Sequence, residues 1–582
     1  MIKSFYRLFL FLTFSFVYSQ DDDTNIKVEK ITVSKSYAPE LTNIIKIRSS
    51  TSVKDMILSD NISVTYKLID TPVISTFQPN KASPLTLQRN SSKDLDFNSQ
   101  FDFGLGTFGQ SNIDLSSNID FDQSQELGLD IINTNYGNIE SSIINSDESR
   151  FIFGINHIYS SKKIQSVHKL FLENHSLNYY GIESQSVVLS DPFILNKIIS
   201  KQLRSKVNLF SRWKIYNSFL KEAELDFILL DDSFDSKEEK VDLKIDFLFP
   251  ILGTSLQVIP KFSYVNSFFK EDYFKNISVK SFYTRVETLI KFGNIENKLK
   301  YQFGGKFNYF LKKSNLDTPD VFISPELMIA YGLNNSRFQA YLKVDGGIEI
   351  NDYSTLSFLN PYISPSSNLI PTQNLYNGRF GFKLFFDSEI KFNLGTHFQK
   401  RNNSYLFKRY AYDPNLTNEG YKLANSYGLV YDNISKYGFF ADTSIYLGKE
   451  NFLGIEIIQN TYRTSQESQP WNLPEFEGRV NIDLNILKKV RVNINSRILG
   501  KRPITYRQVF LNQALENSPT ELKYLSRLSQ VKFEINYKLA PEWRAYMRSQ
   551  LNLGKDKMLW DFYYLNQNLL LFGIRYGFNL RL

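Results

Sequence analysis

The chain ends with the stretch "LLLFGIRYGFNLRL", residues 569–582, in which apolar and polar side chains alternate. Successive side chains of an extended strand point to opposite faces, so residues of one parity share a face. One face of this stretch is apolar and carries Leu570, Phe572, Ile574, Tyr576, Phe578, Leu580 and Leu582. The other face carries only glycines and polar side chains, namely Gly573, Arg575, Gly577, Asn579 and Arg581. Repetition of this pattern along the chain would indicate a sheet with hydrocarbon on one side.

The same alternation recurs in pairs of strands that are joined by short turns. The stretches "EFEGRVNIDLNILKKVRVNINSRI" and "VKFEINYKLAPEWRAYMRSQLNL" each contain two alternating strands, with turns at residues 487–489 and 540–542. Two further hairpins turn at residues 387–388 and 250–253. We predict that the polar faces line the inside of the sheet, and the candidate inward-facing residues are Arg479, Asp483, Arg491, Arg497, Glu534, Arg544, Arg548 and Arg575.

The number of such segments predicts the fold. About twenty alternating segments of roughly ten residues follow one another, with no helical-period segment between them. In lipid every backbone group must be hydrogen-bonded within the protein, so a sheet that faces hydrocarbon has to close on itself. We therefore predict an all-β fold, a closed transmembrane antiparallel β-barrel of about 18 to 22 strands over residues 95–582. Propellers, β-helices and tandem sandwiches are the soluble alternatives. Charges on the second face argue against a sandwich, and the number of segments together with the signal peptide described below disfavours all three.

The connections between the predicted strands fall into two classes, which give the orientation. Tight joins occur at the turns named above and at residues 332–335 and 448–450. Long polar joins lie at about residues 176–203, 266–278, 350–375, 400–435 and 500–528. In outer-membrane barrels short turns face the periplasm and long loops face the outside. Both ends of the barrel segment then lie on the periplasmic side, which requires an even number of strands.

Residues 1–20 predict export. Lys3 and Arg7 precede an apolar run over residues 8–17, and the small Ser19 follows, which is the layout of a cleaved secretory signal peptide. The chain contains no cysteine, so neither disulfides nor a lipid attached to cysteine is expected. A signal peptide followed by a predicted membrane barrel places the protein in the cell outer membrane, where outer-membrane lipid surrounds it.

Composition and motifs argue against several kinds of chemistry. The formal net charge of +8 falls to +6 when Lys3 and Arg7 leave with the signal peptide, and acids are mixed throughout, so nucleic-acid binding is not expected. No cofactor or metal is expected, because metal-ligand spacing is lacking among the four histidines, His157, His168, His175 and His397. No Gly-x-Ser-x-Gly motif occurs either, and we predict that the chain is not an enzyme.

The stretch "GLGTFG" places Gly104, Gly106 and Gly109 at the spacing of a dinucleotide-binding loop. That loop needs a helix after the turn and an acid about 20 residues further on. An alternating strand, "SNIDLSSNIDF", follows instead. We therefore predict that these glycines form a hairpin turn.

The end of the last strand resembles the recognition signal that the barrel-assembly machinery reads in outer-membrane proteins. The signal consists of a polar residue, a glycine two positions later, and hydrophobic residues at the third-last and last positions. Arg575, Gly577, Leu580 and Leu582 match these positions, with leucine in place of the usual aromatic final residue. The resemblance implies that the assembly machinery is a partner during biogenesis.

Residues 21–94 differ from the barrel, since they are polar and alternate little. Within them, Tyr37, Pro39, Lys46 and Ile47 resemble the pre-barrel motif of a Bacteroidota family of outer-membrane proteins labelled TonB-dependent-receptor-like. The segment is too short for the plug domain of a true TonB-dependent receptor. It is expected either to stay in the periplasm or to insert into the lumen.

Three functions follow from these patterns. In the first, which the family resemblance supports, the barrel is a channel or receptor-like transporter whose long loops collect a solute. In the second, it is a non-enzymatic structural or assembly subunit that docks other outer-membrane or periplasmic proteins. The third is a barrel hydrolase or a surface adhesin.

Overall fold

The computed structural model describes residues 97–580, apart from 123, 140–141, 143, 183–199, 252, 296–297, 316–317, 333–336, 387–388, 412–419, 449, 508–519 and 567. The predicted signal peptide, residues 1–20, and the pre-barrel segment, residues 21–94, lie outside this range. Among the described residues, no helix has the length and apolar character needed to cross a membrane.

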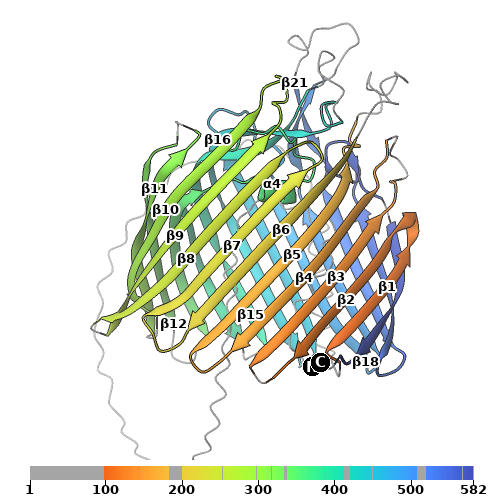
Figure 1. Cartoon of the computed structure of the whole chain (residues 1–582), viewed down its shortest axis with the longest axis horizontal. Coiled ribbons are helices and arrows are strands. Elements are labelled where there is room, and N and C mark those ends of the chain that lie inside the picture. The colour runs from red at the N-terminus through yellow and green to blue at the C-terminus, as the bar shows by residue number, and fades with distance from the viewer. Residues whose placement is uncertain are drawn as a thin grey trace, which may run out of the picture. The chain divides into compact units, whose positions relative to one another are not determined.

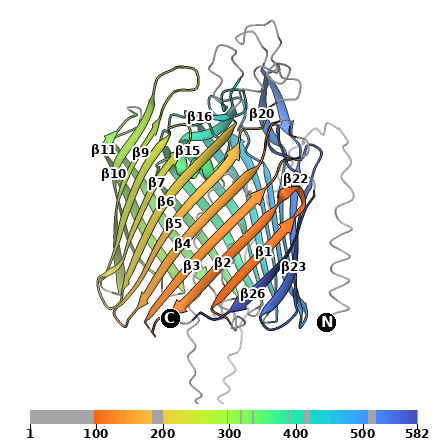
Figure 2. The ribbon, with the colours of Figure 1, turned by 45° about the vertical axis from the view of Figure 1, so that its right-hand side comes forward.

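Twenty-two strands form one antiparallel sheet that closes on itself (Figures 1 and 2). The closing pair joins the first strand to the last, with Asp102 opposite Arg575. The predicted closed barrel is therefore confirmed, with an even number of strands at the upper end of the expected range. The strands are β1 (Ser99–Gly106), β2 (Ser111–Asp120), β3 (Gln125–Tyr136), β4 (Glu148–Ser160), β5 (Ile164–Asn178), β6 (Lys201–Ile215), β7 (Leu220–Asp232), β8 (Lys237–Ile251), β9 (Thr254–Phe269), β10 (Val279–Asn294), β11 (Leu299–Lys313), β12 (Val321–Gly332), β13 (Phe338–Glu349), β14 (Thr372–Phe386), β15 (Ile390–Arg409), β16 (Tyr427–Leu447), β17 (Asn451–Arg463), β18 (Phe476–Leu487), β19 (Val490–Leu499), β22 (Leu528–Lys538), β23 (Trp543–Leu553) and β26 (Asn568–Phe578).

The predicted hairpins are present. β18 pairs with β19 up to Leu487 opposite Val490, and β22 pairs with β23 up to Lys538 opposite Arg544. β8 and β9 close at Ile251 opposite Thr254, and β14 and β15 close at Phe386 opposite Ile390. All these turns lie at one end of the barrel, the turn end, where β1 begins and β26 ends (Figure 2).

The two faces of the strands meet different surroundings. Large apolar side chains are exposed on the outside of the barrel, for example Ile323 at 71% and Phe439 at 67%. The alternate residues point inward, and among them Asp102 is 3% exposed and Glu534 is 7% exposed. Apolar residues outside and polar residues inside are the arrangement of a barrel in a lipid bilayer.

Of the three glycines near the start of the barrel, Gly109 lies in a turn, as predicted, whereas Gly104 lies within β1 and Gly106 is its last residue. β1 ends at Gly106, a short 3-10 turn covers Thr107–Gly109, and β2 begins at Ser111. Gly109 has a positive φ of 67°, which glycine adopts at little cost. A strand rather than a helix follows, so these residues do not form a dinucleotide-binding loop.

The opposite end of the barrel, the loop end, carries the longer connections and most of the remaining regular elements. Two small hairpins lie in these connections: β20 (Arg502–Arg507) with β21 (Thr520–Leu525), and β24 (Met558–Trp560) with β25 (Tyr563–Tyr564). The connection between β13 and β14 contains a short helix, α4 (Tyr353–Leu359), which lies within the loop end of the barrel (Figure 1).

Candidate functional site

The connection of residues 350–371 folds into the barrel because the end of β13 is redirected. The β13–β14 register shifts between Asp345 and Gly347. Gly347 has a φ of 144°, a backbone conformation that residues other than glycine rarely adopt. Two inward-facing cations of the wall hold the redirected backbone. Lys306 Nζ donates to the Gly346 carbonyl at 3.0 Å, and Arg285 donates to the Ile348 carbonyl.

The wall also holds the N-terminus of α4. Asp352 accepts from the Thr355 backbone at 2.8 Å, and Lys240 Nζ lies 2.9 Å from its carboxylate. The Glu238 carboxylate accepts from the backbone of Tyr353 and Ser354. Burial disfavours the charge of Asp352, but Lys240 and Thr355 outweigh that effect and lower the pKa of Asp352. The helix is thus tied to β8 by the Lys240–Asp352 ion pair and by the hydrogen bonds of Glu238.

Four connections meet within the loop end and form what we call the cap: residues 179–182, 350–371, 420–426 and 559–563. Their contacts are mainly aromatic. The rings of Tyr362 and Tyr563 stack with centroids 3.4 Å apart, and Tyr180 meets Tyr563 edge-on at 4.8 Å. Tyr179 donates its hydroxyl to the Ile363 carbonyl at 2.8 Å, and the Asn425 amide donates to the Tyr179 carbonyl at 2.7 Å. Burial raises the pKa of Tyr563 far above its ordinary value, so its phenol stays neutral and can donate.

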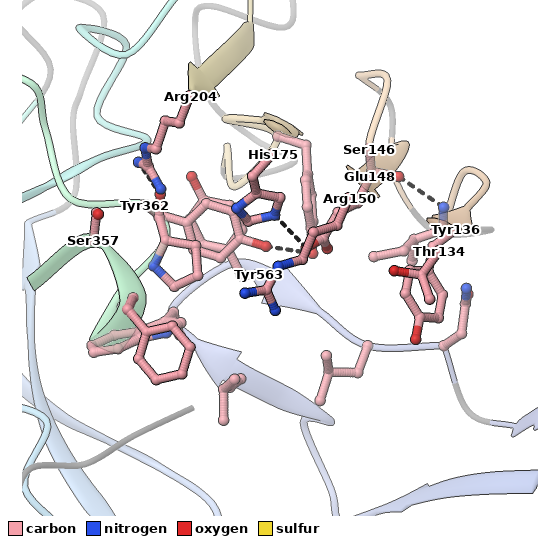
Figure 3. Close-up of a pocket in the computed structure, with 18 of the residues that line it drawn as sticks. Thr134, Tyr136, Ser146, Glu148, Arg150, His175, Arg204, Ser357, Tyr362 and Tyr563 are labelled. Atoms are coloured by element: carbon pink, nitrogen blue, oxygen red, sulfur yellow. Dashed lines mark hydrogen bonds and ion pairs between the residues drawn. The ribbon is translucent and has the colours of Figure 1, made fainter. Parts of the chain in front are cut away.

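A cavity of about 170 Å³ lies between the cap and the inward faces of β3–β7, β22, β23 and β26 (Figure 3). An ion pair and a hydrogen bond cover part of its wall: Arg150 lies 2.7 Å from Glu173, and His175 Nε2 lies 2.8 Å from the Glu148 carboxylate. Arg204 reaches the cap and donates from Nη2 to the Pro361 carbonyl at 2.6 Å. Its Nε is buried without a hydrogen-bond partner among the described residues. Arg204 therefore keeps one donor that the described residues do not use.

The rest of the cavity lining combines apolar rings with neutral polar groups. Tyr180, Tyr362 and Tyr563 contribute faces and edges of rings, and Phe358 of α4 is 48% exposed. Amides and apolar side chains complete the lining, among them Gln530, Gln550, Asn552, Leu565 and Leu569. Apolar walls with a few oriented polar groups are typical of pockets for small molecules. The described residues contain no group of three or more His, Cys, Asp or Glu side chains that could hold a metal ion.

The predicted inward-facing residues form two groups, and neither lines this cavity. The first group lies at the closing seam. Arg575 Nη2 lies 2.8 Å from Asp102 and 3.4 Å from Glu534, and Arg548 Nη2 lies 2.8 Å from Glu534. Arg544 stands opposite Arg575 in the β23–β26 pairing. These contacts join the first strand of the barrel to its last three.

The second group lies on β17–β19. Arg491 Nη2 is 2.5 Å from Asp483, and Arg479 Nη1 is 3.1 Å from Glu456 on β17. The Arg479 and Arg491 side chains are each 48% exposed to the lumen, whereas the Arg497 residue is 9% exposed and stands opposite Arg479.

The structure describes only part of the remaining sequence predictions. Of the C-terminal signal, Gly577 pairs with Gln100 at the seam, and Leu580 is exposed beyond the end of β26. Leu582 lies outside the described residues, as does the pre-barrel motif of Tyr37, Pro39, Lys46 and Ile47. The cavity residues were not anticipated, because they come from separate strands and loops with no shared sequence motif.

No protein-family model and no curated protein matches the sequence. Solved structures do match the fold. The ferripyoverdine receptor of the outer membrane of Pseudomonas aeruginosa has a TM-score of 0.60 at 12% identity, covering 83% of this chain and 72% of the receptor. The siderophore receptor PirA from Acinetobacter baumannii has a TM-score of 0.59 at 11% identity, covering 82% and 80%. The FrpB iron transporter from Neisseria meningitidis has a TM-score of 0.58 at 10% identity, covering 84% and 82%.

These likenesses concern the fold. The chain is an outer-membrane β-barrel with the fold of the two receptors and the transporter named above. The sequence prediction of an outer-membrane barrel agrees with them.

Proposed function

We propose that this chain is an outer-membrane receptor of the TonB-dependent type, which binds a solute between the cap and the wall and passes it through the barrel when the cap moves. The observation that carries the proposal is the inward fold of residues 350–371. Within this connection Tyr353, Leu356 and Ile363 are at most 1% exposed, so side chains rather than water fill this part of the lumen. A solute would need the connection to move before it could pass.

The cavity beside the cap supports binding before passage. It lies among residues of β4–β6 and of the cap itself, so a bound solute would touch the connection that has to move. The fold shared with two siderophore receptors and an iron transporter supports a receptor role. We extend that role, and not their cargo, to this chain. Residues 21–94 would lie in the periplasm or enter the lumen, where they could contact an energy-coupling partner.

Ion conductance across a planar bilayer tests the role of the cap. Four proteins are compared: the full chain, a variant with residues 353–369 replaced by a short Gly-Ser linker, a variant without residues 21–94, and the double variant. We expect replacement of residues 353–369 to raise conductance severalfold in at least the background that lacks residues 21–94. Equal conductance with and without the connection in both backgrounds would contradict gating by the cap.

A structural or assembly subunit is the second candidate function, and one observation favours it. The β20–β21 hairpin lies at the loop end (Figure 2), and its Leu522 and Tyr524 are 46% and 52% exposed. Exposed apolar side chains on a hairpin suit docking of another envelope protein. Co-purification of a fixed partner from native membranes, lost in a Leu522→Ser, Tyr524→Ser variant, would support this role over solute uptake.

A further inference from the structure

A second cavity, of about 40 Å³, also borders Trp560. Its walls come from β15, β16 and β17 and from the connection that follows β17, and Trp560 lines both cavities. By the same measure of cavity volume, one water molecule needs about 10–15 Å³. The second cavity therefore has room for a molecule of a few heavy atoms.

Lys436 lines this cavity and has no partner there. It lies on β16 between Gln399 of β15 and Tyr462 of β17, and it is 8% exposed. Among the described residues, no acceptor or carboxylate lies within hydrogen-bond or ion-pair distance of its Nζ. The Glu477 carboxylate of β18 acts on Lys436 electrostatically, but it lies beyond ion-pair distance and does not line the cavity. An ammonium group in such a place is costly unless a group in contact pairs with it.

Arg401 adds a second cation to the same wall. Its Nη2 lies 3.7 Å from the Glu349 carboxylate, which is longer than a charge-assisted hydrogen bond of about 2.7–2.9 Å. With the Gln399 amide turned so that its oxygen faces Arg401, this oxygen accepts from Nε at 2.9 Å. Among the described residues that line the cavity, none is acidic. The cavity is therefore electropositive and short of acceptors.

One neutral group limits which anion would fit. Asn472 donates from Nδ2 to the Phe407 carbonyl at 2.7 Å, which orients its amide. Its Oδ1 is then buried and has no donor among the described residues. A ligand that satisfies the whole cavity must accept from Lys436 and Arg401 and also donate to Asn472.

We propose that this cavity binds a phosphate group that carries a hydroxyl, with Lys436 and Arg401 on its oxygens and Asn472 accepting from the hydroxyl. Inorganic phosphate has such a hydroxyl near neutral pH, whereas sulfate has only acceptors. A phosphate monoester loses its last hydroxyl proton near pH 6. The inference concerns a separate cavity and does not depend on the solute of the first one.

Equilibrium binding of radiolabelled inorganic phosphate to the full chain in detergent tests the proposal, with ionic strength held constant by sodium chloride. We expect one phosphate per chain, competition by unlabelled phosphate, and at least tenfold weaker competition by sulfate. Methyl phosphate at pH 7.5 tests the hydroxyl, because this monoester is then a dianion with no hydroxyl left and should bind more weakly. Tight binding of methyl phosphate, or equal competition by sulfate, would overturn the assignment to a hydroxyl-bearing phosphate.

Two variants remove binding by opposite routes. Lys436→Met removes the cation, and Asn472→Asp places a carboxylate in the same cavity as Lys436, which supplies a counter-charge and protects folding. Both should lower phosphate affinity at least tenfold, while Lys383→Met, an inward-facing lysine that does not line the cavity, should bind normally. Undetectable binding to the full chain, as expected if only water fills the cavity, or equal binding by all variants, would overturn the proposal.

Discussion

The wall of the barrel and the cap are held by different kinds of contact. In the wall, paired residues come from neighbouring strands, as with Leu487 and Val490 across one turn. In the cap, Tyr179 bonds to Ile363, which lies 184 residues further along the chain. The wall can therefore form hairpin by hairpin, whereas the cap requires several distant connections to be in place together. We expect the two regions to respond to mutation separately.

The largest expected effect separates the cap from the wall. Trp560 is fully buried in the cap, and truncation of a buried tryptophan to alanine costs about 3–5 kcal/mol. Trp560→Ala should therefore speed amide hydrogen exchange in residues 353–363 while the barrel keeps its heat-dependent gel mobility. Trp543→Ala, on the outside of the barrel with Trp543 41% exposed, is the control. An equal loss of stability throughout the wall would show that cap and wall unfold as one unit.

The next prediction tests the two faces of the wall at one depth. Ile482 and Asn481 are neighbours in the middle of β18, with Ile482 outward and Asn481 inward. Ile482→Arg should cost about 2–4 kcal/mol because it places a charge in hydrocarbon near the bilayer midplane. Asn481→Arg should cost far less. Urea titration of refolding into lipid vesicles measures both, and similar costs would mean that the faces are assigned wrongly.

A smaller effect should link pH to the cap alone. Asp352 has its pKa held below 3.8 in the folded cap, so its contribution is present above about pH 4 and is lost as pH falls through the folded-state value. Asp352→Asn should weaken the cap at pH 7 by about 1.5–3 kcal/mol, since a hydrogen bond to a charged group is lost. Limited proteolysis of α4 from pH 7 to pH 3 should show acid loosening in the parent. An unchanged pH response in the variant would assign that response to other groups.

The smallest effect concerns a turn of the wall. Gly448 has a φ of 72°, and an added Cβ would meet no atom within 4 Å, so only backbone strain opposes a side chain. Gly448→Ala should lower barrel stability by about 1–2 kcal/mol. Gly448→Asn should cost less, because asparagine tolerates this conformation. Amide exchange in the cap should not change in either variant, and faster exchange there would mean that this turn is coupled to the cap.

The same difference explains how much could be predicted from the sequence. The turns at residues 487–489 and 540–542 and the outward or inward face of each strand follow from alternation, which is a local property. The inward fold of the join at residues 350–375 does not follow, because its polar, proline-containing sequence reads as an outer loop. Tyr362 and Tyr563 meet only because the closed barrel brings their connections together. Lys436 belongs to an alternating strand, but the sequence cannot show that its ammonium group lacks a contacting acceptor, because this depends on how the neighbouring strands are placed.

The seam between β1 and β26 has a consequence for biogenesis. Asp102 and Arg575 are 473 positions apart, so neither can find the other until almost the whole polypeptide has been delivered to the membrane. Until then the sheet has two unpaired edge strands, one carrying the negative charge of Asp102 and the other the positive charge of Arg575. A chain cut short by even one hairpin at its C-terminus would leave Asp102 unmatched and the cylinder unsealed. Such a product should be recognised by envelope proteases as unfinished, which makes closure of this seam a natural checkpoint for quality control.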